Sequence, residues 1–180
     1  MKFQMNIFIQ RIQQGILTIP SPKAWLYSAI LLLLFAVISL PIGLYFKFLK
    51  LELFHKSLFA ASKVIMFSIF TPAITEELFF RVLLLPHLTE KASISDQWLW
   101  GCFSLLIFII YHPIEGITVF PAGFSTFINP VFLFLAALLG SLCTIIYFQT
   151  GSFWTSVIFH WIVVIVWLLL LGGYRKLNIQ

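Results

Sequence analysis

Residues Thr71–Arg81 read TPAITEELFFR and lie inside the long apolar run Val64–Leu85. The stretch holds two adjacent acidic side chains, and an arginine follows the second of them one helical turn later. Ionisable groups are costly in the hydrocarbon core of a membrane, so a cluster of them there indicates a functional site. Pro72 removes one backbone hydrogen bond in mid-run, which predicts a bend in the helix just ahead of the acids.

The composition is that of a membrane protein. The chain has 180 residues, of which 61% are hydrophobic and 9% charged, whereas a soluble domain is about half apolar and about one quarter charged. The net charge is +5, but the eleven Lys and Arg residues are scattered along the chain without a basic stripe. The sequence therefore predicts no nucleic-acid partner, and we expect the positive charge to face membrane lipid with anionic headgroups.

The predicted fold is all-α: a polytopic transmembrane helix bundle with about five spans plus an N-terminal interfacial amphipathic helix. Residues 1–23 alternate apolar and polar positions at helical spacing, which predicts a helix lying in the interface, and residues 24–180 form the bundle. A run of about 20 apolar residues crosses a hydrocarbon core of about 30 Å. The predicted spans are Ala24–Phe46, Val64–Leu85, Trp98–His112, Val131–Phe148 and Phe153–Leu171, the last two joined by a tight turn at residues 149–152.

The third span is predicted to end at His112, because a proline follows it. Residues 113–130 contain three prolines and two glycines, which predicts a loop folded over the bilayer surface or partly into it. Glu115 is expected to be a loop residue.

Helical geometry directs the side chains of Glu76 and Glu77 to different faces of the helix. Glu77 and Arg81 are four residues apart and share a helix face, in the favourable order of acid before base. Glu76 lies about 100° further round, so it must face another partner, and the spans supply His112 and His160 as candidates. Taken singly, the Glu77–Arg81 pair is typical of a structural ion pair, and a lone membrane histidine is typical of a hydrogen bond between helices.

A carboxylate and two imidazoles gathered from three helices have two chemical uses. They can hold a water molecule and accept its proton, making the nucleophile for hydrolysis of an amide or ester. The same Glu76, His112 and His160 can instead ligate a divalent metal such as zinc, which would activate the water.

Three motifs in order resemble one protein family. Glu76–Arg81 resembles the EExxxR motif of the CPBP family of intramembrane proteases, the CAAX prenyl protease and bacteriocin-processing group also called Abi. Phe108–His112 matches the second motif of that family, FxxxH, and Thr150–His160 is similar to its third region. The resemblance predicts a CPBP-like core at residues 64–171.

The resemblance implies an endopeptidase that hydrolyses peptide bonds in membrane-embedded or lipidated substrates. Glu76 would be the base that activates water, His112 would help to hold that water, and His160 would act on the oxyanion side of the site. Glu77 and Arg81 would be the supporting pair. No cofactor is implied as required, and zinc is the alternative. The small size of the chain favours a bacterial inner membrane.

One position departs from the family pattern. Val164 stands four residues after the last histidine, where the family usually has Asn or Asp as an oxyanion donor. Loss of one such donor typically costs about 10²–10³ in rate, and Asn129 is a candidate substitute. The alternative interpretation is therefore a non-catalytic membrane scaffold or a bacteriocin-immunity-type protein that retains the fold.

Overall fold

The computed structural model describes residues 2–177, with side chains described from residue 7 onward. Within that part of the chain, five helical segments are long and apolar enough to cross a membrane. They are α2 (Pro22–Tyr45), the broken segment Leu58–Glu90, α5 (Ile94–Thr118), α7 (Pro130–Thr150) and α8 (Phe153–Leu170). The described residues contain no β-strand among their secondary-structure elements. The predicted all-α bundle of five spans is confirmed.

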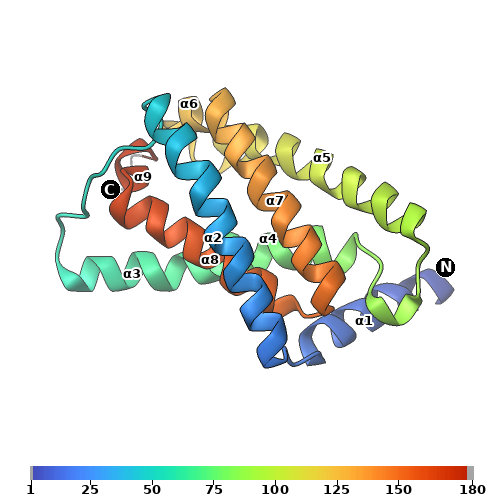
Figure 1. Ribbon diagram of the computed structural model, residues 1–180. Helices are drawn as coiled ribbons and strands as arrows, with labels where there is room; N and C mark the ends of the chain where they lie inside the picture. The colour runs from blue at the N-terminus through green and yellow to red at the C-terminus, as the bar shows by residue number, and fades with distance from the viewer. Residues whose placement is uncertain (1, 178–180) are drawn as a thin grey trace.

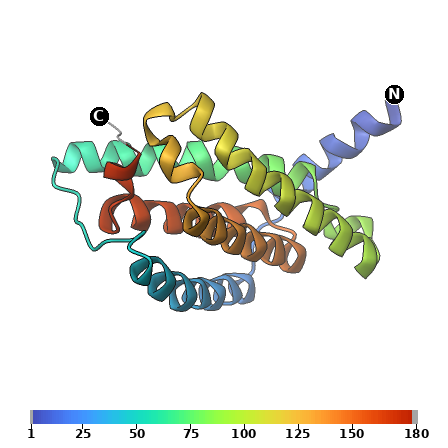
Figure 2. The same cartoon turned by 90° about the horizontal axis from the view of Figure 1, so that it is seen from above.

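Helix α7 is the centre of the bundle. It packs against α2, α5 and α8, and Figure 1 shows α7 between α2 and α5. Seen from above, α8 lies between α2 and α3 (Figure 2). A buried apolar cluster joins α2, α7 and α8 through Phe35, Leu139 and Phe159.

The shorter elements connect and complete the spans. They are α1 (Lys2–Leu17), α3 (Leu58–Ser68), η1 (Ile69–Ile74), α4 (Thr75–Glu77), η2 (Leu78–Leu83), η3 (Leu88–Glu90), η4 (Pro121–Gly123), α6 (Phe124–Phe127) and α9 (Gly173–Lys176).

The tight turn predicted at residues 149–152 is confirmed, and its residues explain it. Gly151 ends α7 with a φ of 64°, a left-handed conformation that glycine adopts without steric cost. A Cβ added there would lie 2.9 Å from Leu88 Cδ1. Ser152 then caps α8 by accepting a hydrogen bond from the backbone N–H of Trp154. Helices α7 and α8 are therefore forced into antiparallel contact.

The second span is broken as Pro72 predicts. Thr71 leaves the helical region, with φ −130° and ψ 111°, because proline disfavours a helical conformation in the residue before it. Two π-helical segments, η1 and η2, flank the short α4 that carries both acids. The Ser104 hydroxyl donates to the Phe80 carbonyl of η2 at 2.6 Å. Such π-helical turns frequently occur at functional sites.

The predicted end of the third span at His112 is wrong. Helix α5 continues through Pro113 to Thr118, and η4 and α6 occupy part of the predicted loop. Proline costs the helix one hydrogen bond, but packing of the next turn compensates. Gly116 lies so close to α6 that a Cβ there would be 2.7 Å from Phe127 Cβ. Tertiary contact thus holds the helix together beyond its proline.

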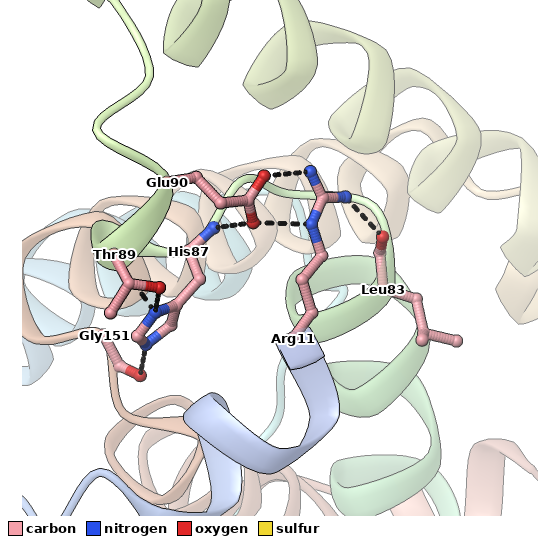
Figure 3. A network of polar contacts seen from close by, with 6 residues as sticks. All are labelled: Arg11, Leu83, His87, Thr89, Glu90 and Gly151. Atoms are coloured by element: carbon pink, nitrogen blue, oxygen red, sulfur yellow. Dashed lines mark hydrogen bonds and ion pairs between the residues drawn. The ribbon is translucent and has the colours of Figure 1, made fainter. Parts of the chain in front are cut away.

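Helix α1 is tied to the bundle by a polar network (Figure 3). Arg11 donates two hydrogen bonds of 2.7 Å to the Glu90 carboxylate and one of 2.9 Å to the Leu83 carbonyl. Glu90 also accepts from the backbone N–H of His87, whose Nε2 donates to the Gly151 carbonyl at 3.0 Å. The predicted helix is present, and its position relative to a bilayer stays a prediction.

We expect Arg11→Ala to loosen α1. The variant removes a bidentate ion pair whose arginine side chain is only 11% exposed, so the free energy of unfolding should fall by about 1–2 kcal/mol. Thermal unfolding in detergent measures the loss. Arg175→Ala is the matched control, because Arg175 pairs with Glu52 in the same bidentate way but is 63% exposed. Equal losses in the two variants would contradict the structural role of the Arg11 pair.

Candidate active site

Glu77 and Arg81 form the ion pair that their spacing predicts. Arg81 Nε lies 3.2 Å from Glu77 Oε2, and both side chains are at most 1% exposed. Arg81 Nη2 also donates to the Gly140 carbonyl of α7 at 2.9 Å, and its guanidinium lies 4.7 Å from the centre of the Phe108 ring. A charge pair buried so deeply needs this additional hydrogen bonding and stacking. The pair connects the broken span to α5 and α7.

His160 lies between the two acids. Its Nδ1 is 2.8 Å from Glu77 Oε1, and its Nε2 is 4.0 Å from Glu76 Oε2. Because the Glu77 carboxylate is an acceptor, the hydrogen of a neutral imidazole is on Nδ1. Nε2 then faces Glu76 with its lone pair. The distance to Glu76 is longer than a hydrogen bond, so both groups remain available to a reacting molecule.

His112 is oriented in the same way by its own helix. Its Nδ1 lies 2.7 Å from the Phe108 carbonyl one turn earlier, and a carbonyl can only accept. Nδ1 therefore carries the hydrogen of the neutral ring, and Nε2 is an acceptor. The ring is held between Phe108 and Phe132, whose centres lie 4.6 and 5.3 Å away.

Glu76, His112 and His160 all line one cavity of about 780 Å³. The cavity walls come from α2, α3, η1, α4, α5, α6, α7, α8 and α9 and are mostly apolar. Lys56, Lys63 and Tyr174 are the other titratable side chains among the described residues that line it, apart from Glu115. The structure thus brings the three predicted site residues to one space, with Glu77 and Arg81 behind them.

The sequence interpretation missed Glu115. It is not a loop residue: it lies in α5, is 4% exposed and lines the same cavity. Its spacing of three residues from His112 was the available signal, because residues three apart share a helix face. This spacing could not be used, because the sequence predicted that the helix ends at His112 and that Glu115 lies outside it.

Val164 and Asn129 have different surroundings. Val164 lines the cavity one turn after His160 and packs with Phe127 and Leu168. Asn129 caps α7, where its Oδ1 accepts from the backbone N–H groups of Val131 and Phe132. Asn129 is not among the cavity-lining residues, so this candidate substitute lies outside the cavity.

No group of three or more His, Cys, Asp or Glu side chains within the described part of the chain has the geometry to hold a metal ion. Zinc binding by Glu76, His112 and His160 stays a prediction. We assign no chemical step to a metal. What the geometry offers is a carboxylate beside two imidazole acceptors in a cavity with apolar walls.

Comparison with known proteins identifies the family. A family model described as type II CAAX prenyl endopeptidase Rce1-like matches residues 58–166. The match spans more than half of the chain and includes Glu76, Glu77, Arg81, His112 and His160. Searches of the curated proteins and of the solved structures gave no match. Together with the five apolar spans, the family match makes this an integral membrane protein with the fold of a CAAX-type intramembrane protease. The chain belongs to the Rce1-like family of type II CAAX prenyl endopeptidases.

Proposed function

We propose that this protein is an intramembrane endopeptidase that hydrolyses peptide bonds with water activated by Glu76. The observation that carries the proposal is the convergence of Glu76, His112 and His160 on one apolar cavity within the matched region. A carboxylate and imidazoles within reach of one water are the groups that general base catalysis needs.

The proposed roles follow from the orientation of each group. Glu76 accepts a proton from water, and His112 Nε2, the acceptor left by the hydrogen bond to Phe108, holds the second hydrogen of the same water. The water oxygen then attacks the scissile carbonyl carbon. When the C–N bond breaks, the proton on Glu76 passes to the leaving amine.

Glu77 and Arg81 are positioning residues in this proposal. Glu77 accepts from His160 Nδ1 at 2.8 Å and is itself held by Arg81 at 3.2 Å. This series of contacts keeps His160 Nε2 directed toward Glu76. On the oxyanion side of the site, His160 acts as a donor when its ring carries a second proton.

The cavity supports an apolar substrate. Its lining is dominated by Leu, Phe, Val, Ile and Ala side chains, and such a lining favours a membrane-embedded peptide or a lipid-modified chain. We therefore propose these as substrate classes, and a bacterial inner membrane as the location.

The direct test is cleavage by purified protein. We expect the protein in detergent or proteoliposomes to cut members of a library of prenylated and transmembrane peptides, with new termini identified by mass spectrometry. Water labelled with ¹⁸O should place one heavy oxygen in each new carboxyl terminus, since water is the nucleophile. A mock preparation from cells lacking the chain controls for contaminating proteases. Absence of cleavage above that control would favour the non-catalytic scaffold.

A further inference from the structure

Glu115 is a buried acid that the proposed mechanism does not use. It lies in α5 three residues after His112, is 4% exposed and lines the cavity that Glu76 also lines. Within the described residues, no hydrogen bond or ion pair occupies its carboxyl group. Its carboxyl group lines the cavity and is therefore available to a group that arrives with the substrate.

Two carboxyl groups on one apolar cavity do not both ionise. Glu76 and Glu115 line one cavity with mostly apolar walls, and carboxyl groups that share a poorly solvated site hold a proton between them. If Glu76 is the base, Glu115 is the member that keeps the proton. A protonated carboxyl group is an O–H donor, whereas a carboxylate can only accept.

Neither imidazole of the site has a free N–H in its neutral form. Neutral His112 uses its N–H on the Phe108 carbonyl, and neutral His160 uses its N–H on Glu77. Val164, one turn after His160 on the cavity wall, offers no polar atom. Hydrolysis of an amide needs donors aimed at the developing oxyanion, and a site with two is usual.

Phe127 links the Glu115 end of α5 to the buried cluster that contains Val164. The next residue, Gly116, leaves so little space that an added Cβ would be 2.7 Å from Phe127 Cβ. Phe127 and Val164 belong to one buried cluster. A donor placed on Glu115 and a donor placed at position 164 would therefore serve the same region of the cavity.

We propose that protonated Glu115 donates a hydrogen bond to the scissile carbonyl oxygen, as an oxyanion donor that compensates for the apolar side chain at Val164. The proposal rests on the proposed function. Water forms the new C–O bond and gives its proton to Glu76, while the carbonyl electron pair moves to the oxygen that Glu115 contacts. As the C–N bond breaks, the carbonyl re-forms and Glu76 gives its proton to the amine. Glu115 keeps its own proton throughout.

The test compares kcat/KM for four variants with the wild type, using a peptide that the wild type cleaves. Glu115→Ala should lower kcat/KM by about 10²–10³-fold, the usual cost of one oxyanion donor. Glu115→Gln should remain within about tenfold of wild type, because an amide also donates. Glu115→Ala combined with Val164→Asn should regain at least about tenfold over Glu115→Ala alone, because the new amide restores a donor. Glu115→Ala combined with Leu168→Asn is the matched control and should regain nothing, since Leu168 lines the cavity one further turn along α8.

Each outcome decides the proposal. Full activity in Glu115→Ala would mean that the donor lies elsewhere, for example on an imidazolium at His160, and would overturn it. Equal losses in Glu115→Gln and Glu115→Ala would mean that a proton is transferred rather than shared, and would overturn it too. So would equal recovery with Val164→Asn and Leu168→Asn. Unfolding temperatures of all variants separate a folding defect from a lost donor. A wild type that cleaves nothing contradicts the proposed function, whereas cleavage that needs Glu76 but not Glu115 contradicts this inference alone.

Discussion

Replacing Glu76 with Gln should lower kcat/KM by about 10³-fold or more while leaving the fold intact. The amide has nearly the same shape as the carboxyl group but cannot accept a proton from water, and general base catalysis contributes about 10²–10⁴-fold. Glu76 is 4% exposed and its Oε2 has no hydrogen-bond partner among the described residues. Removing its charge should therefore not lower the unfolding temperature, because no strong contact of Glu76 is lost.

The measurement is the rate of peptide cleavage at several substrate concentrations, with thermal unfolding of the same preparations. Glu52→Gln is the control for a general effect of removing a carboxylate, since Glu52 lies in the connection between α2 and α3 and pairs with Arg175. Cleavage by Glu76→Gln at the wild-type rate would refute Glu76 as the base.

Replacing Arg81 with Met should be the most destabilising single change in the site. The variant leaves the Glu77 carboxylate, which is 0% exposed, without its cation. Removing one partner of a buried pair costs about 3–5 kcal/mol, because the remaining charge stays desolvated. It also removes the hydrogen bond to Gly140 and the contact with the Phe108 ring. We expect a large fall in unfolding temperature and in the yield of monodisperse protein.

A double variant isolates the cause. Glu77→Gln combined with Arg81→Met removes both charges, and an amide oxygen can still accept from His160 Nδ1, so part of the lost stability should return. Lys63→Met is the matched control, because Lys63 is an exposed cation on α3 of the same broken span. An Arg81→Met protein that unfolds at the wild-type temperature would contradict the structural role of the pair.

The five spans could be predicted because apolar runs of this length have few other uses in a protein. The Glu77–Arg81 contact could be predicted as well, since a spacing of four residues sets the distance on a helix whatever surrounds it. The break at Thr71 followed from Pro72 for the same local reason. Each of these features depends on a few neighbouring residues.

The extent of α5 could not be predicted in this way. A local rule ends a helix near Pro113, but packing of Gly116 on Phe127 belongs to a contact between α5 and α6. Glu115 was misplaced for that reason, and with it the second carboxyl group of the cavity. Asn129 was a candidate oxyanion donor, but its side chain caps the start of α7.

The sequence by itself determined the class of fold, the number of spans, the family motifs and the acidic pair, because hydrophobic length and helical spacing act over short distances. The tertiary structure alone decided which side chains of other helices each acid meets. Glu77 is enclosed by Arg81 and His160, whereas Glu76 faces a cavity shared with His112 and Glu115. The physical reason is that these partners come from α4, α5, η2 and α8, and only packing of those elements against one another brings their side chains into one apolar space.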